Sequence, residues 1–182
     1  DMNADDAFNY GAIGVVIGHE MTHGFDDQGR QYDKDGNLKD WWTTEDAKNF
    51  EKRAAVMINH FDSIEVAPGV HANGQFTLGE NIADHGGLQV SFQAFKKATS
   101  DKPLNTVQGF TPEQRFFLAY ANVWAGNIRP EEILRLTKID PHSLGKWRVD
   151  GALPHIAAWY DAFGITDKDK LFLPAEQRVS IW

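Results

Sequence analysis

One short motif constrains this chain more than any other stretch: His19, Glu20 and His23 form the pattern His-Glu-x-x-His. On an α-helix, histidines with this spacing lie on one face, close enough to bind a single metal ion. Glu20 points about 100° around the helix from His19, which puts its carboxylate beside the metal rather than on it. A carboxylate there can take a proton from a metal-activated water. The motif therefore predicts a metal site with Glu20 as its general base.

The residues around the motif favour a buried helix. The β-branched run Val15-Val16-Ile17 leads into it, and Gly24 follows the second histidine at a point where a helix can end. We expect a helix over residues 11–25. The alternative is a buried amphipathic helix in which both histidines are incidental.

The composition restricts both the metal ligands and the partners. The 182 residues include no cysteine, which excludes disulfides and thiolate zinc sites, so any zinc must be bound by histidine and carboxylate. The net charge of −8 argues against nucleic acid as a partner. No apolar run reaches the length of about 18 residues that a membrane helix needs, so we expect no membrane span in this segment.

The length and the start of the chain bear on its organisation. With 182 residues, of which 42% are hydrophobic, the chain can form one domain with a sizeable core. It begins at Asp1 with neither an initiator methionine nor a signal peptide, so we expect a piece of a longer protein. The absence of cysteine fits a reducing compartment or a bacterial exported protein without disulfides, and does not choose between them.

A catalytic zinc bound by two histidines needs a third protein ligand and an open position for water. One known spacing requires Gly and His where this chain has Asp26 and Gly29, and another requires a glutamate where it has Trp42. Both therefore fail. The remaining pattern is a distant helix that offers a glutamate with an aspartate one turn later.

Glu80 and Asp84 fit that pattern, because their spacing puts both carboxylates on one helix face. Glu80 would bind the metal, and Asp84 would accept the second ring N–H of a ligand histidine. The alternatives stay open at this point. Thr77 and Glu80 also form the pattern of a capping box, in which Glu80 folds back on the backbone, and Asp84 can be an ordinary solvated acid.

The rest of the chain predicts a mostly α domain with at most a small hairpin. Apolar residues at helical spacing, together with start and stop signals, indicate helices over 11–25, 44–61, 77–95, 111–124, 130–139 and 153–163. A tight-turn composition within residues 30–38 suggests the hairpin. The pair Gly86-Gly87 lies inside a helix and indicates that another element approaches closely there. His60 lies beside an apolar stripe, and we expect it on the surface.

These residues together resemble the neprilysin and endothelin-converting enzyme family of zinc endopeptidases. The similar stretches are residues 9–11, 16–27, 35–36, 40–42, 79–84, 86–88, 124–126, 129–131, 140–145 and Arg148. The resemblance implies a thermolysin-like (gluzincin) fold for residues 1–182, as the C-terminal catalytic domain of a longer chain. It implies a metalloendopeptidase that cleaves oligopeptides and carries one Zn²⁺ per chain.

The resemblance also assigns roles to single residues. It makes His19, His23 and Glu80 the zinc ligands, and it makes Asp84 the neighbouring acid that is commonly counted as catalytic. It implies that His142 steadies the tetrahedral oxyanion. Arg148 would then hydrogen-bond the substrate backbone beyond the scissile bond.

Two further residues would line the apolar pocket for the side chain after that bond, namely Val16 and Trp124. None of the roles of Val16, Trp124, His142 and Arg148 follows from composition or spacing. Without the resemblance, His142 is a loop histidine and Arg148 is a surface arginine.

The chain departs from the family pattern in two ways. Family members carry an upstream strand that pairs with the substrate and a large helical domain over the site, and neither is in this sequence. The N-terminal part of the parent chain is therefore an expected partner, beside the peptide substrate. Mammalian members have a cysteine where this chain has Val179, so we expect a bacterial relative that is periplasmic or secreted.

Overall fold

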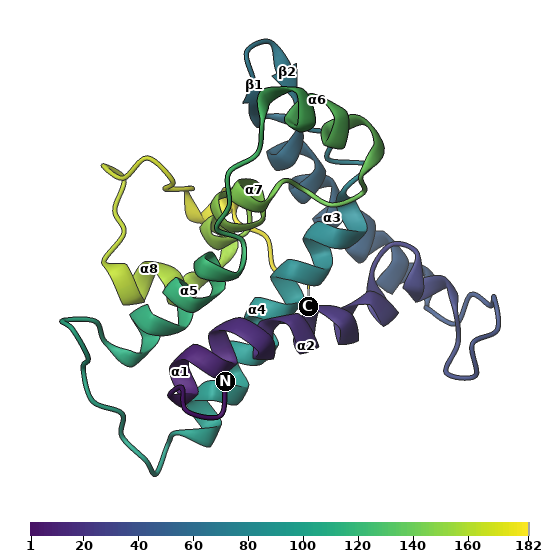
Figure 1. The fold of residues 1–182 in the computed structure, drawn as a ribbon. Coiled ribbons are helices and arrows are strands. Elements are labelled where there is room, and N and C mark those ends of the chain that lie inside the picture. Colours follow the sequence, from purple (N-terminus) through teal and green to yellow (C-terminus); the bar gives the residue numbers. More distant parts are fainter. Residues whose placement is uncertain (182) are drawn as a thin grey trace.

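The computed structural model describes residues 1–181, and the fold is mostly helical with one two-stranded hairpin, as the sequence predicts (Figure 1). The helices are α1 (Asp6–Asn9), α2 (Val15–Thr22), α3 (Thr44–Asp62), α4 (Leu78–Ala98), α5 (Pro112–Val123), α6 (Pro130–Ile139), α7 (Gly145–Asp150) and α8 (Ala157–Phe163). The strands are β1 (Glu65–Ala67) and β2 (Val70–His71), paired antiparallel. Among the described residues, no helix has the length and apolarity needed to cross a membrane.

The helix that carries the motif begins earlier than expected. α1, a π-turn (Tyr10–Gly14), α2 and a 3₁₀ turn (His23–Phe25) follow one another without a break. Asp5 starts this run, because its carboxylate accepts the backbone N–H of Phe8 at 2.8 Å. The expected start of this helix at residue 11 was therefore too late, since residues 6–10 are helical as well.

α2 and α4 lie side by side (Figure 1), and glycines permit their close approach. A Cβ added to Gly87 would lie 2.6 Å from the carbonyl oxygen of Val15 and 2.8 Å from the backbone nitrogen of His19. Gly18 faces the same contact from α2, where a Cβ would lie 3.0 Å from Cα of Gly87. The expected close approach at Gly86-Gly87 is confirmed, and it is what brings the histidines of α2 against the acids of α4.

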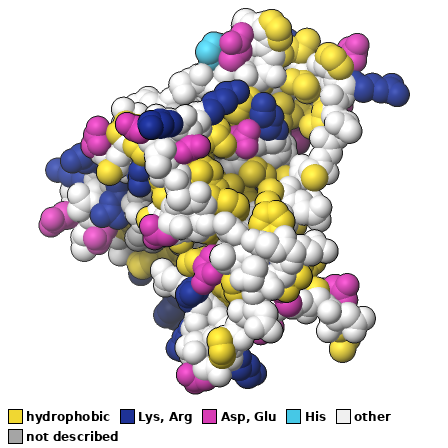
Figure 2. Space-filling model, turned by 90° about the vertical axis from the view of Figure 1, so that its left-hand side faces the viewer, with side chains coloured by type: hydrophobic (Ala, Val, Ile, Leu, Met, Phe, Trp, Pro, Cys, Tyr) yellow, Lys and Arg dark blue, Asp and Glu magenta, His cyan; other side chains and the backbone are white. Residues whose placement is uncertain are grey.

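Two apolar clusters flank this helix pair. The first lies between α4, α5 and α8 and includes Phe95, Phe116 and Trp159. The second lies between α3, α4 and the tail, and includes Met57 and Ile82. On the face at the left of Figure 1, hydrophobic side chains also gather across the middle of the surface, between charged groups (Figure 2).

Two local expectations were wrong. The hairpin forms around Pro68-Gly69, where Gly69 has φ +71, and not at residues 30–38, where Tyr32 and Leu38 form only an isolated bridge. The bridge does not extend because Leu38 is 72% exposed and has no core to pack on. Helix α7, Gly145–Asp150, was also missing from the predicted helices, although His142 just before it lies in a loop as expected.

Candidate metal centre

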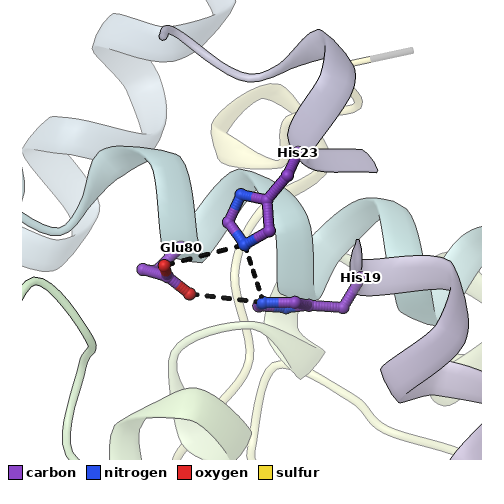
Figure 3. A group of neighbouring side chains, drawn as sticks. All are labelled: His19, His23 and Glu80. Carbon is purple, nitrogen blue, oxygen red and sulfur yellow. Dashed lines mark hydrogen bonds and ion pairs between the residues drawn. The ribbon is translucent and has the colours of Figure 1, made fainter. Parts of the chain in front are cut away.

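Three side chains from α2, the following 3₁₀ turn and α4 converge on one point (Figure 3). The Nε2 atom of His19 lies 3.0 Å from Nε2 of His23 and 3.2 Å from Oε2 of Glu80. The Nε2 atom of His23 lies 3.6 Å from Oε1 of Glu80. In residues 1–181, these three form the one group of three or more His, Asp or Glu side chains with ligand atoms within 4.8 Å of one another.

The protonation pattern of these histidines calls for a cation. The Nδ1 atom of His19 lies 2.8 Å from Asp84, and that of His23 lies 2.7 Å from Asp26, so each ring donates its Nδ1–H to a carboxylate. When both rings are neutral, each Nε2 then presents a lone pair to the other and to Glu80. Such a cluster of acceptors is stable when a shared cation lies between them. Two imidazoles and one carboxylate are a donor set of catalytic zinc sites, so the residues fit this ion.

The charged groups around the cluster shift the pKa values of His19 and Glu80, and these shifts also agree with a cation site. Burial by itself lowers the pKa of His19, but hydrogen bonds to Asp84 and Glu80 outweigh it and raise the pKa to about 9. For Glu80, burial raises the pKa, while the neighbouring His19, His142 and His23 bring it below its ordinary value. The site therefore stabilises positive charge at His19 and negative charge at Glu80.

The start of α4 does not form the alternative capping box. No side chain caps the helix at Thr77; its hydroxyl donates to the carbonyl of Asn73 at 3.0 Å and accepts from Asn81 at 2.9 Å. Glu80 is thus turned toward the histidines rather than toward the backbone. Its role as a ligand stays a prediction that this geometry favours.

Asp84 joins the metal site to Arg148. Nε of Arg148 donates to one oxygen of Asp84 at 2.8 Å, and Nη2 donates to the other at 2.7 Å. The guanidinium also stacks 3.7 Å from the ring centre of Trp124, and the backbone carbonyl of Arg148 accepts the hydroxyl of Tyr120 at 2.8 Å. Arg148 is 7% exposed, so it is not the surface arginine that spacing alone suggested.

His142 lies beside the cluster, in the loop that precedes α7. Its Nε2 is 3.2 Å from Oε2 of Glu80, and its Nδ1 is 2.7 Å from Oδ1 of Asp140. The Asp140 carboxylate also accepts the backbone N–H of His142 at 3.0 Å, which fixes the ring. His142 is outside the group that can share one ion, so it can act on a molecule bound at the site.

A cavity of about 240 Å³ opens against this centre. It is lined by Val15, Val16, His19, Glu20, Asp84, Tyr120, Trp124, His142 and Arg148. The structure thus brings every predicted catalytic and substrate-binding residue to one cavity, with His23 and Glu80 at the adjoining cluster. Their individual roles remain predictions.

Three residues of the site were missed. Asp26 lies three residues after His23, and Asp140 lies two before His142; both are local spacings that the sequence carries. Neither stands out, because aspartates of this kind are common in turns. Tyr120 comes from α5, and no sequence signal connects it to Arg148.

Comparison with known proteins identifies the family. Residues 1–179 match the model of peptidase family M13. The chain belongs to peptidase family M13. Human neprilysin is 40% identical over 181 residues, which cover 97% of this chain and 24% of neprilysin. Bovine endothelin-converting enzyme 1 is 42% identical over 165 residues, which cover 88% of this chain and 22% of that enzyme.

Solved M13 structures share the fold. The zinc metalloprotease Zmp1 of Mycobacterium tuberculosis, solved in complex with an inhibitor, has a TM-score of 0.96 and 41% identity, covering 100% of this chain and 29% of Zmp1. PepO from Lactobacillus rhamnosis has a TM-score of 0.88 and 33% identity, covering 100% of this chain and 27% of PepO. The chain therefore spans about a quarter of the length of these M13 proteins, and its His19, His23 and Glu80 cluster suits a family that uses zinc.

Proposed function

We propose that this chain is the single C-terminal catalytic domain of a zinc metalloendopeptidase that hydrolyses peptide bonds in oligopeptides. The observation that carries the proposal is the convergence of His19, His23 and Glu80 beside a cavity that Glu20 lines. These three side chains would hold one Zn²⁺ per chain, and the cavity would hold the scissile bond.

Glu20 is the proposed general base. A zinc ion bound here would supply Lewis acidity, which makes water acidic near neutral pH and polarises a carbonyl. Glu20 is exposed at the cavity and shares helix α2 with His19, so its carboxylate can take the proton of the attacking water. It then carries that proton to the amine of the leaving group.

His142 is the proposed oxyanion donor. Its Nδ1 is held by Asp140, and its Nε2 lies 3.2 Å from Oε2 of Glu80 in this structure. When Glu80 binds zinc instead, Nε2–H would donate to the oxygen of the reacting carbonyl. The ring is already fixed by two contacts with Asp140. A fixed donor of this kind typically lowers the barrier by about 2.7–4 kcal/mol.

Arg148, Val16 and Trp124 would bind the part of the peptide beyond the scissile bond. Asp84 and the ring of Trp124 fix the guanidinium of Arg148, which makes it an oriented donor for a peptide carbonyl. Val16 and Trp124 supply apolar wall to the same cavity, which suits a hydrophobic side chain.

The remaining N-terminal part of the parent chain is the proposed partner, since the chain spans about a quarter of its relatives. That partial coverage motivates the second candidate function, a zinc-binding domain that has no activity by itself. An extended peptide needs a strand edge to pair with, and within residues 1–181 the two-stranded sheet β1–β2 is the one sheet described.

A bacterial origin with a periplasmic or secreted location is also a proposal; the absence of cysteine supports it.

Metal analysis and peptide cleavage test both candidates. This chain is loaded with zinc, one equivalent is confirmed, and a quenched fluorescent peptide is assayed beside the longer parent chain. We expect the parent to cleave, this chain to cleave poorly or not at all, and Glu20→Gln in the parent to keep zinc while losing cleavage. Cleavage by that parent variant at the unmodified rate would overturn the role of Glu20, and absence of stoichiometric zinc would overturn both candidates.

A further inference from the structure

The tail segment, residues 178–181, lies in a slot between α3, α4 and the 3₁₀ turn Leu153–His155. Val179 is 5% exposed and Ile181 is 1% exposed, and both belong to the cluster that packs between α3 and α4. Nη1 of Arg53 donates to the carbonyl of Ile181 at 2.9 Å. The backbone N–H of Val179 donates to Nδ1 of His155 at 3.2 Å. The tail is therefore held by apolar burial and by a histidine acceptor.

That histidine belongs to a trio of histidines outside the metal centre, two of which are buried. The ring of His155 lies 4.7 Å from that of His60 on α3 and 6.5 Å from that of His85 on α4. His85 is 0% exposed and His155 is 4% exposed. His60 is half-buried and its Nε2 atom is buried, so the expectation of a surface histidine there holds only in part. In the described part of the chain, the trio is not among the groups that can share a metal ion.

The contact with Val179 fixes the form of His155. Because Nδ1 accepts a backbone N–H, the ring proton must lie on Nε2 and the ring must be neutral. A second proton would go to Nδ1 and would point at the N–H of Val179, so two donors would face each other. His155 can therefore hold a second proton on Nδ1 only if the tail moves away.

The surroundings of His155 offer no compensation for a positive charge. The titratable or charged groups that face it are His60 from α3, His85 from α4 and Arg178 from the tail itself. Burial, followed by the charges of these three groups, lowers the pKa of His155 to about 3. Burial likewise lowers the pKa of His85 to about 4 and that of His60 below its ordinary value.

We propose that His155 is an acid-sensitive latch whose protonation releases the tail segment from its slot. The latch is independent of the proposed catalytic function, since it uses none of the metal-site residues. The released tail would uncover the cluster that contains Ile82, which lies on α4 two residues from Glu80. Acid would therefore loosen the core behind the metal centre before the rest of the fold opens.

The direction of the pH dependence follows from the two states. In the released state His155 has the ordinary pKa of about 6.5, and in the slot its pKa is about 3. The closed state binds fewer protons than the released state. The slot is therefore fully favoured above the pKa of His155 in the released state, and this preference is lost progressively as the pH falls toward the pKa of His155 in the slot. Between pH 7.5 and pH 5, this linkage shifts the opening equilibrium by about 30-fold.

Hydrogen exchange of the tail amides tests the latch. We expect the amide of Val179 to exchange about 30-fold faster at pH 5 than at pH 7.5, after correction for the intrinsic pH dependence of exchange. Amides of α5 should keep their protection over this range. Simultaneous loss of protection in the tail and in α5 would mean global unfolding and would overturn the proposal.

A matched pair of variants separates the latch from general acid effects. His155→Asn keeps an acceptor near the position of Nδ1 but cannot be protonated, so the tail should stay protected at both pH values. His71→Asn is the control, because His71 is exposed and its ring is hydrogen-bonded to the carbonyl of Asp62, away from the tail. It should keep the response of the unmodified chain. An unchanged acid response in His155→Asn would overturn the latch.

A direct titration keeps the test independent of whether His155→Asn folds. Histidine side-chain NMR of the unmodified chain reports the protonation of His155 as the pH falls. We expect His155 to change from the neutral Nε2–H form to imidazolium together with the loss of protection at Val179. Release of the tail while His155 remains neutral would overturn the proposal.

Discussion

Asp26 holds the ring of His23 from the side opposite to Glu80. Its Oδ2 lies 2.7 Å from Nδ1 of His23, while Nε2 of the same ring faces Glu80 at 3.6 Å. The other oxygen of Asp26 accepts backbone N–H groups from Gln28 at 2.9 Å and Gly29 at 2.7 Å. The carboxylate is thus fixed before any ion binds, and it fixes the ring in turn. Each histidine of the cluster has its own aspartate, although the sequence pointed only to Asp84.

We expect Asp26→Asn to weaken zinc binding by about 10–100-fold, the usual cost of losing a carboxylate behind a ligand histidine. The amide is a weaker acceptor, so it raises the basicity of His23 less. Competition with a chelator gives the dissociation constant. Asp27→Asn is the control, because the Asp27 side chain bonds Gln28 and not a histidine. Equal affinities of the Asp26 variant and the unmodified chain would exclude this role.

The two glutamates of the site should respond differently to the same change. Glu80→Gln should sharply weaken zinc binding, because it removes the one carboxylate whose oxygens face both histidine Nε2 atoms. Glu20→Gln should leave zinc affinity nearly intact, because Glu20 lines the cavity and is outside the cluster. Metal titration of both variants is the measurement. Full affinity in Glu80→Gln would refute the ligand assignment.

Arg148→Ala should destabilise the fold by about 3–5 kcal/mol, because it removes the guanidinium that pairs with the buried Asp84 carboxylate. Stacking on Trp124 is lost as well. Urea unfolding measures the change, and Arg129→Ala, at an exposed position, serves as the control. A change within about 0.5 kcal/mol, as for a surface substitution, would show that the pair adds little.

Local helix geometry explains how much of the site the sequence could reveal. The spacings of His19 and His23, and of Glu80 and Asp84, each lie within one helix, so one turn of a regular structure was enough to predict them. Arg148 could not be placed in this way. Its contacts to Asp84 and Trp124 join three elements, and contacts of this kind depend on how the elements pack in the fold.

The fold shows the same contrast between features set by local sequence and features set by long-range packing. The helix over residues 130–139 was predicted from Pro130 onward, because proline at the first turn is a local signal. The hairpin was assigned to the wrong turn, since turn composition does not tell which strands find an apolar partner. The burial of His155 depends on the tail packing between distant elements, and no local sequence pattern predicts it.

Gly87→Ala should destabilise the chain by about 1–3 kcal/mol, the usual cost of overpacking a core. Its Cβ would lie 2.6 Å from the carbonyl oxygen of Val15, so α2 and α4 would have to separate. Zinc affinity should fall as well, because the two helices carry the ligands. Gly24→Ala is the control, since a Cβ there meets nothing within 4 Å. Thermal unfolding with and without zinc checks both effects.

The last prediction concerns the outer face of the helical run that contains α2. Ile13 is 54% exposed, Ile17 is 55% exposed and Met21 is 65% exposed. These residues are one turn apart, so they form an apolar stripe about 12 Å long on one face. The opposite face carries Val15 and His19, which pack toward α4. A stripe of this kind usually meets another protein surface.

We expect this chain to self-associate through the stripe when it is studied without the rest of its parent. The double variant Ile17→Gln, Met21→Gln should shift the population toward monomer in sedimentation velocity, because it removes apolar area without changing the buried face. Lys52→Gln on the exposed side of α3 is the control and should leave the association unchanged. Zinc affinity should stay the same in both variants, which separates loss of the stripe from loss of the fold. If the unmodified chain remains monomeric at every concentration, or if the double variant associates equally, the stripe is not the contact surface.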